Sequence, residues 1–291
     1  MSRWYNSGII KMKKYLVIIL STVVLFAFSR CEEFAGEPIT KDFSISGAYT
    51  ALEVEDAFDI TVSDVATQVT VTAGEYVMPN VVVETVGNTL KIYLKGLHTS
   101  RGTDMKVTLP YNANLTSVDL SGASSFQSEY RLKGSKVVVE LSGASDFHGN
   151  IDSDKVSIDL SGASNFFGNI LADKIDMNLS GSSNIKGFVG AIELDIDLSG
   201  ASDATLEGEV GTLKVDLTGS SNIVKNVNGK RYALACDLCE GTMSGASNAY
   251  IHCDGEIKVS LSGASDLHFT GSAFTGDSST SGSSHIYHDV L

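Results

Sequence analysis

The sequence predicts an all-β fold built as a β-solenoid, in which short strands stack coil upon coil around one core. Two observations lead to this fold class. A short Ser-Gly-Ala-Ser motif recurs at nearly constant spacing, and most copies follow a stretch of apolar and polar alternation. Composition agrees, because 43% of the 291 residues are apolar and 28 Gly stand against only 3 Pro, which suits strands joined by tight turns.

The repeat dominates residues 116–291, which are therefore expected to form the solenoid. Successive motif glycines are 21, 19, 19, 19, 19, 26, 18 and 19 residues apart, so one coil holds about 19 residues. A single copy cannot bury its apolar face, whereas stacked copies share a continuous core. At the usual inter-strand spacing, the coils give a rod about 40 Å long. The copies begin at Leu120, Leu141, Leu160, Leu179, Leu198, Leu217, Met243, Leu261 and Thr280.

Alternation before each motif predicts which side chains face the core. In the third copy Val156, Ile158 and Leu160 face inward, and Ser157 and Asp159 face outward. The motif itself is interpreted as the corner of a coil. Its Gly permits a positive φ, and its small Ala and Ser fit a tight bend, where stacked Ser hydroxyls can hydrogen-bond between coils.

The residue that follows each motif is Asn or Asp in most copies. Asn can extend a ladder of side-chain amides along the stack, whereas adjacent carboxylates repel each other. We therefore expect a structural ladder at these positions, with a ligand site as the alternative. They are Ser125, Asp146, Asn165, Asn184, Asp203, Asn222, Asn248, Asp266 and His285.

Residues 43–115 also have strand character. Runs such as 58–62, 69–71, 81–84 and 90–94 alternate or are apolar between turn residues, and Gly87-Asn88 indicates a hairpin between the last two. We interpret this part as the first coils or as an N-terminal cap, because a solenoid needs its exposed end covered. A separate small β domain is the alternative.

The N-terminal segment has the pattern of an export signal. Basic residues at 11–14 precede an apolar run over 16–28, which is too short to span a bilayer. Residues 1–30 are thus a predicted signal peptide and 31–42 a linker. The arrangement resembles a bacterial lipoprotein signal, which implies lipidation of Cys31, although Arg30 stands where a small residue is usual. The expected location is the outer membrane, facing the periplasm or the cell surface, with secretion as the alternative.

Three stretches resemble one bacterial family: Phe58-Asp59-Ile60-Thr61-Val62, Val107-Thr108-Leu109-Pro110 and the serial Leu-Ser-Gly-Ala-Ser copies. The chain is similar over roughly residues 43–290 to the putative auto-transporter adhesin, head GIN domain family, which is frequent in Bacteroidetes lipoproteins. The resemblance implies a right-handed parallel β-helix, an envelope location and a non-enzymatic, adhesin-like role.

Charge narrows the range of partners. The formal net charge is −14, and without residues 1–30 the chain keeps 16 basic against 35 acidic residues, a net charge of −19. Such a surface repels phosphate backbones and excludes nucleic acid as a partner. The expected partner is a protein or a glycan, with the membrane reached through the lipid anchor only.

Three cysteines lie near the 26-residue step of the repeat: Cys236, Cys239 and Cys253. In an oxidising envelope one disulfide among them is expected, with a buried free thiol or a metal site as alternatives. The sequence has no second Cys pair at zinc-ligand spacing.

The outward residue before each motif forms an acidic stripe if the coils stack in register: Asp119, Glu140, Asp159, Asp197 and Asp216, interrupted by Asn178. It is interpreted as a solvated stripe, with a weak Ca²⁺ site as the alternative; no other cofactor is expected. The six histidines show no spacing that suggests a catalytic triad. A lyase-like polysaccharide-processing enzyme and a purely structural lipoprotein are the alternatives to a binding module.

Overall fold

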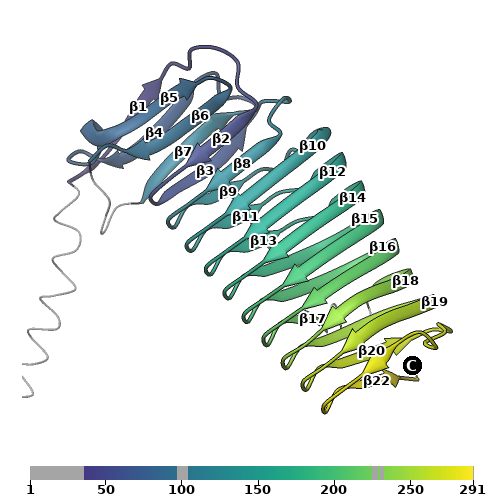
Figure 1. The fold of residues 1–291 in the computed structure, drawn as a ribbon. Helices are drawn as coiled ribbons and strands as arrows, with labels where there is room; N and C mark the ends of the chain where they lie inside the picture. The colour runs from purple at the N-terminus through teal and green to yellow at the C-terminus, as the bar shows by residue number, and fades with distance from the viewer. Residues whose placement is uncertain (1–35, 97–103, 225–228, 230–232, 291) are drawn as a thin grey trace, which may run out of the picture.

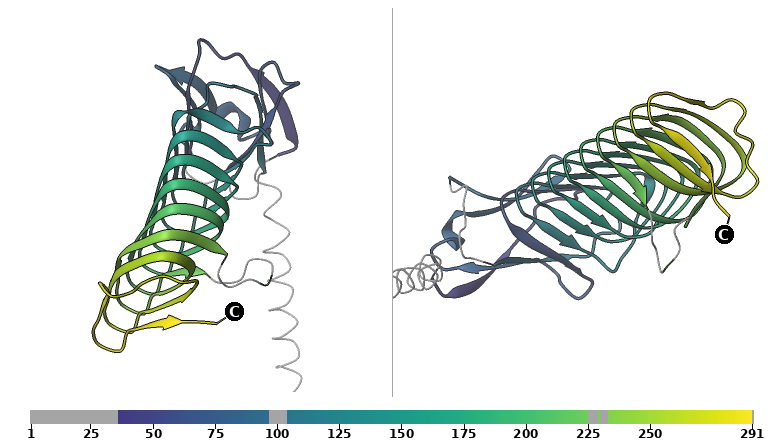
Figure 2. Two further views of the ribbon diagram at one scale, coloured as in Figure 1. Left: turned by 90° about the vertical axis from the view of Figure 1, so that its right-hand side faces the viewer. Right: turned by 90° about the horizontal axis from the view of Figure 1, so that it is seen from below.

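A computed structural model of the chain describes residues 36–96, 104–224, 229 and 233–290. The predicted signal peptide and Cys31 lie outside the described residues. Figure 1 shows a rod of stacked coils that starts from a small group of strands at the N-terminal end, and Figure 2 shows the same stack from two other sides. Among the described residues, no helix has the length and apolar character needed to cross a bilayer.

The repeat region is a parallel β-solenoid with about 19 residues per coil, as predicted. In one coil β12 (Ile151–Leu160) runs to the motif corner, the chain reverses, and β13 (Asn165–Phe167) returns. β12 pairs in parallel with β14 (Ile170–Leu179) one coil on, with Ile151 opposite Ile170 and Leu160 opposite Leu179. The other strands of the stack are β8 (Ser117–Leu120), β9 (Ser125–Gln127), β10 (Leu132–Leu141), β11 (Asp146–His148), β15 (Asn184–Leu198), β16 (Asp203–Leu217), β17 (Asn222–Val224), β18 (Leu234–Met243), β19 (Asn248–Leu261), β20 (Asp266–Thr270), β21 (Ser279–Thr280) and β22 (His285–His288).

The core is a column of apolar side chains inside the coils. Val156, Ile158 and Leu160 are at most 2% exposed, which confirms the predicted alternation. On the returning strands the rings of Phe126, Phe147 and Phe166 stack from coil to coil with centroids 5.2 and 4.8 Å apart. Each coil thus contributes the same layers, and the coils cohere by burial of these layers.

The motif corner depends on its glycine. Gly162 has φ +76°, and the main-chain N–H of Ala163 donates to the carbonyl of Gly143 in the preceding coil, 2.8 Å away. A Cβ on Gly162 would collide with that same carbonyl, so the close stacking of corners excludes any side chain here.

The last serine of the motif has a different role from the one expected. Ser164 is fully buried, and its hydroxyl donates to the carbonyl of Ser161 in its own turn, 2.8 Å away. The first serine, Ser161, reaches the carbonyl of Leu141 in the preceding coil only at 3.4 Å. The strongest serine bonds therefore close each corner, and the bonds between coils are weaker.

The N-terminal part is both coil and cap. β2 (Ala51–Val54) and β3 (Phe58–Ser63) form a coil that pairs in parallel with β8 and β9. Asp56 takes the corner position with φ +75°, where later coils have glycine. A further coil, β6 (Thr89–Leu94) and β7 (Met105–Pro110), stacks on the outer side of β2 and β3 although it comes later in the chain.

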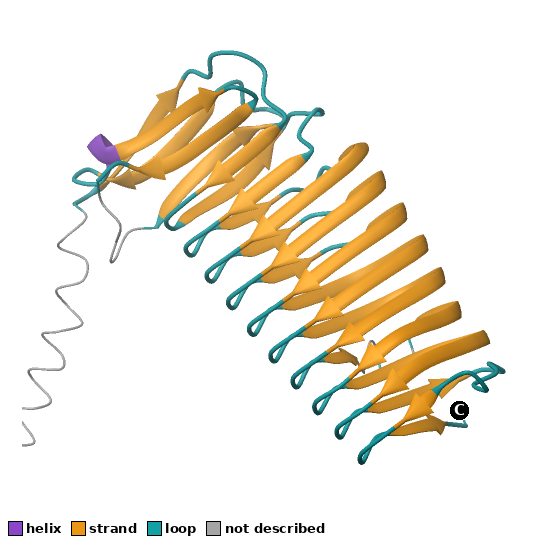
Figure 3. Cartoon of the chain, viewed as in Figure 1, coloured by secondary structure: helices purple, strands orange, loops and turns teal. Residues whose placement is uncertain are grey.

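Antiparallel strands cover the outer edge of this last coil. β5 (Val81–Val86) forms the predicted hairpin with β6 through Gly87, and β4 (Val69–Gly74) pairs with β7. β1 (Pro38–Phe43), which overlaps the end of the predicted linker over 31–42, pairs with β4 along its whole length. Figure 3 shows the only helix of the described residues, the short 3₁₀ turn η1 (Met78–Asn80), beside β5.

Candidate functional site

The most regular surface feature is a row of acidic side chains on the long strands. We call Asp119, Glu140, Asp159, Asn178, Asp197 and Asp216 the acidic row. Each member is the direct register partner of the next, from β8 through β10, β12, β14 and β15 to β16. The predicted alignment of these six residues is therefore what the fold produces, with Asn178 as the one uncharged member.

Beyond Asp119 the acidic row is extended by two residues that the sequence did not indicate, and the second of them is basic. Glu53 on β2 is the register partner of Asp119, and Lys91 on β6 is the partner of Glu53. The Lys91 ammonium contacts the Glu53 carboxylate at 2.6 Å. These two residues could not be assigned beforehand, because the coil that carries Lys91 stacks out of chain order.

A shallow groove of about 430 Å³ runs along the acidic row. It is lined by the row from Asp119 to Asp197 and by the first serines of four motif corners, Ser142, Ser161, Ser180 and Ser199. Each of the four coils from Glu140 to Asp197 therefore offers one member of the acidic row and one serine hydroxyl, repeated at the inter-strand spacing of about 4.8 Å. The buried leucines Leu141, Leu160 and Leu179 also line it.

Burial and like charges in register together disfavour the ionised form of two members of the row. Burial and the neighbouring Glu140 and Glu53 raise the pKa of Asp119 above its usual value. Burial, Asp216 and Asp195 likewise raise the pKa of Asp197. Two other carboxylates of the row accept hydrogen bonds from neutral side chains. The Asn178 amide donates to Asp159 at 3.0 Å. The Thr242 hydroxyl donates to Asp216 at 2.8 Å.

A second groove, of about 410 Å³, adjoins the C-terminal end of the acidic row. It is crossed by Asp195, Lys214, Glu240 and Lys258, which are register partners in that order. Here the charges alternate in sign from coil to coil, so neighbours attract. Because Asp216 also lines it, the second groove still holds one more acid than base, and most of the unbalanced negative charge lies along the first groove.

The acidic row suits diffuse attraction of cations better than a closed metal site. Ca²⁺ takes six to eight oxygen ligands at about 2.3–2.6 Å, whereas neighbouring members of a straight row are about 4.8 Å apart. In the ranges that the structure describes, no group of three or more His, Cys, Asp or Glu side chains converges on one metal position.

The three cysteines lie inside the core rather than on the surface. Cys236 and Cys239 are on β18 and Cys253 is on β19, and all three are buried free thiols in this structure. Cys236 and Cys253 are direct register partners, whereas Cys239 faces Ile257. The predicted disulfide remains a prediction. The register places Cys236 and Cys253 opposite each other on adjacent strands.

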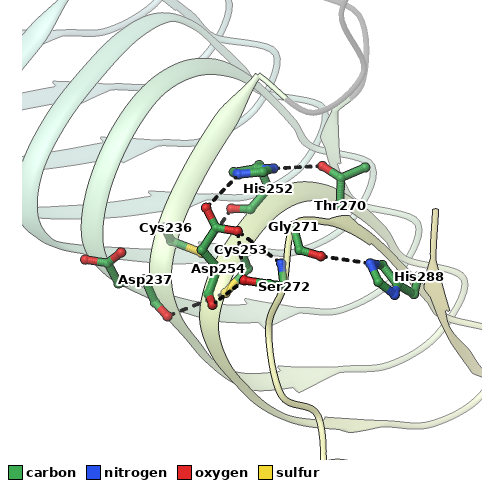
Figure 4. A network of polar contacts seen from close by, with 9 residues as sticks. All are labelled: Cys236, Asp237, His252, Cys253, Asp254, Thr270, Gly271, Ser272 and His288. Carbon is green, nitrogen blue, oxygen red and sulfur yellow. Dashed lines mark hydrogen bonds and ion pairs between the residues drawn. The ribbon is translucent and has the colours of Figure 1, made fainter. Parts of the chain in front are cut away.

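One histidine makes contacts that sequence spacing did not reveal. His252 Nδ1 lies 3.0 Å from the Thr270 hydroxyl, and its Nε2 lies 3.0 Å from Asp254 Oδ2 (Figure 4). The main-chain N–H of Ser272 donates to the other Asp254 oxygen at 3.0 Å, and this bond, followed by His252, lowers the pKa of Asp254. Thr270 is only 2% exposed, so a substrate has no access to its hydroxyl. The chain of contacts ties the last coils together.

Comparison with known proteins places these features in a family. The family model described as "Putative auto-transporter adhesin, head GIN domain" matches residues 48–188 and 165–273. The match spans the acidic row and most of the coils. No curated protein matches the chain.

Solved structures with the same fold include three proteins from Parabacteroides species. A putative adhesin from Parabacteroides distasonis is 20% identical with a TM-score of 0.64, over 87% of this chain and 98% of that one. A putative adhesin from Parabacteroides merdae is 17% identical with a TM-score of 0.63, over 88% and 97%. A protein from Parabacteroides distasonis described as a putative lipid binding protein is 20% identical with a TM-score of 0.57, over 88% and 98%. At these identities the likeness concerns the fold.

Proposed function

Because the chain belongs to the putative auto-transporter adhesin, head GIN domain family, we propose that it is a non-enzymatic binding module of the cell envelope, adhesin-like in role. The observation that carries the proposal is the groove along the acidic row. It joins in-register carboxylates to a line of corner hydroxyls on a rigid stack of coils.

The chemistry of this groove favours some partners over others. Carboxylates accept hydrogen bonds from hydroxyl-rich ligands, and serine hydroxyls both accept and donate them. The negative potential attracts basic protein surfaces. Polyanions such as uronate-rich chains are repelled by the same potential. We therefore propose a neutral glycan or a basic protein segment as the partner of the groove.

The test is binding to a glycan array and to basic peptides, with one variant and one matched control. Asp159→Asn with Asp197→Asn removes two charges from the acidic row. Asp154→Asn with Asp173→Asn removes two charges from exposed positions outside the groove. The proposal expects at least tenfold weaker binding for the first pair and unchanged binding for the second; equal effects of both pairs would contradict it.

An enzymatic alternative is separated by turnover. A lyase acting on uronates needs basic side chains near the substrate to neutralise its carboxylates, and both grooves expose more acid than base. Incubation of the protein with polysaccharide libraries, followed by detection of unsaturated or reducing ends, distinguishes the two. Release of product from any of them would overturn the binding-module proposal.

Attachment through Cys31 is the second part of the proposal. The sequence pattern of residues 1–31 supports export and lipidation, and lipid attachment would leave the coils outside the bilayer. Labelled palmitate incorporation, compared between the natural chain and Cys31→Ala, tests the anchor. Protease treatment of intact cells then tells the cell surface from the periplasm.

We also propose a weak Ca²⁺ site, and we place it on the acidic row alone. A dedicated site predicts that millimolar CaCl₂ raises the melting temperature more than MgCl₂ at the same ionic strength, and that Asp159→Asn abolishes the difference. Equal shifts with both salts would reduce the effect to screening of the row.

A further inference from the structure

The three buried thiols form a cluster for which the binding function gives no reason. Cys236 is 4% exposed and Cys253 is fully buried. Their Cα atoms are register partners on the adjacent parallel strands β18 and β19. Such partners are about 4.8 Å apart, within the range of about 4.4–6.8 Å that a disulfide spans.

The two thiols also reach across to each other's strand. Cys236 Sγ lies 3.7 Å from the carbonyl of His252, the residue before Cys253. Cys253 Sγ lies 3.6 Å from the carbonyl of Asp237, the residue after Cys236. Each side chain thus extends toward the neighbouring coil, at the point where the register shifts between Cys236 and Leu238 (Figure 4).

Cys239 is close as well, but its position is less suited to bonding. Its thiol contacts that of Cys236, and this contact, followed by burial, raises the pKa of Cys236. However, Cys239 is on the same strand as Cys236, and its register partner on β19 is Ile257. A bond between Cys236 and Cys239 would close a ring within one strand and leave the coils unlinked.

We propose that Cys236 and Cys253 form a disulfide that staples two consecutive coils, with Cys239 left as a free thiol. The oxidant is a disulfide-exchange partner, either a protein disulfide or a small one such as an oxidised dithiol. One cysteine thiolate attacks the oxidant and releases one of its sulfurs as a thiol. The second cysteine then displaces the other sulfur, so two S–H bonds are lost and the oxidant is reduced to two thiols.

Timing follows from burial. In the closed coils the thiolate is scarce, because contact with Cys236 and burial raise the pKa of Cys253, and the thiolate is the attacking species. Exchange therefore takes place before β19 closes on β18, during folding in an oxidising compartment. After closure the same burial protects the bond from reductants.

The decisive measurement is peptide mapping of the full chain by mass spectrometry. For this experiment the protein is produced with export to an oxidising compartment. It is then alkylated under denaturing, non-reducing conditions and digested. The expected result is one linked peptide pair containing Cys236 and Cys253, with Cys239 alkylated. Three alkylated cysteines, or a link between Cys236 and Cys239, would overturn the proposal.

Matched variants test the consequence for stability. Cys239→Ala retains both members of the proposed pair, so a reductant present during unfolding should lower its melting temperature by about 6–12 °C. This is the size of effect expected when the disulfide that closes a loop of this length is lost. Cys253→Ala is expected to show no such dependence on reductant. Because each variant is compared with itself in the two redox states, the cavity left by the substitution cancels. A reductant-dependent shift in Cys253→Ala, or none in Cys239→Ala, would contradict the assigned pair.

Discussion

Asn184 donates a hydrogen bond from its side-chain amide to Oδ1 of Asn165, 2.9 Å away in the preceding coil. Asn165 in turn donates to Asp146 at 2.7 Å, and the pattern resumes where Asn222 donates to Asp203, also at 2.7 Å. The predicted amide ladder is therefore confirmed. Asp146 and Asp203 thus each accept from an Asn amide of the next coil, whereas Asp266 accepts from the main-chain N–H of His285 at 3.1 Å.

Replacement of Asn165 by Asp should break this ladder. Asp146 would lose its donor, and two carboxylates would stand in register, at a cost of about 1–2 kcal/mol. Urea unfolding at neutral pH and low salt measures the loss. Gln127→Glu, which adds the same charge at an exposed position on β9, is the control and should change stability little. Equal stability of Asn165→Asp and the natural chain would show that the amide bond is not needed.

The buried motif serine gives a second prediction. Ser164→Ala removes the 2.8 Å bond that a fully buried hydroxyl donates to the carbonyl of Ser161, and we expect a loss of about 1–2 kcal/mol. Ser161→Ala removes only a 3.4 Å contact from an exposed position and should cost less than half as much. Chemical denaturation of the two variants side by side is sufficient. The reverse order would contradict the assignment of the strong bond to Ser164.

The tight packing of the corner glycines can be tested by comparison with a glycine that also has a positive φ but has no atom close to the position of a Cβ. Gly162→Ala adds a Cβ against the carbonyl of Gly143, whereas Gly87→Ala at φ +61° meets open space. Left-handed strain alone costs about 1–2 kcal/mol, and the collision should add several more in Gly162→Ala. Circular dichroism melts are expected to show partial or complete unfolding for Gly162→Ala only. Similar melts for both would mean that the corners are not tightly stacked.

The raised pKa values in the acidic row predict a pH dependence. A carboxyl whose pKa is higher in the folded than in the unfolded state binds its proton more readily when folded, so folding is favoured as pH falls. Ionised Asp119 and Asp197 should therefore destabilise the fold at neutral pH, and this cost should diminish as pH falls through the folded pKa to the unfolded pKa. In Asp197→Asn stability should be higher at pH 7, and this part of the pH dependence should be absent.

Glu193 supplies the opposite case on the same sheet. Hydrogen bonds from Lys174 and Lys214 lower its pKa, so its contribution is present above the unfolded pKa and is lost as pH falls through the folded one. Glu193→Gln should be less stable than the natural chain at pH 7 and should approach it in acid. Urea midpoints measured from pH 7 to pH 4 test both variants. Parallel curves for all three proteins would contradict the two assignments.

The repeat made the fold and the acidic row predictable. A fixed step of 19 residues places Glu140, Asp159 and Asn178 in register whatever the details of the corner, so side-chain rows could be read directly from spacing. The burial of the last motif serine was missed, because a polar residue gives no hint that its bond stays within its own turn. The role of Lys91 was missed because the β6–β7 coil stacks on the earlier β2–β3 coil. The spacing of the repeat gives no indication of this stacking order. The contacts of His252 depend on a single irregular coil.

That stacking order has a consequence for how the chain becomes folded. The β2–β3 coil lies between β6–β7 on one side and β8–β9 on the other, so neither neighbour exists until residues far along the chain have arrived. Every later coil can instead dock on one that is already complete. Folding of the chain thus has a slow beginning with long loops to close, followed by rapid addition of coils one at a time. Deletions from the C-terminal side should shorten the rod coil by coil, whereas loss of β6 and β7 should prevent it from starting.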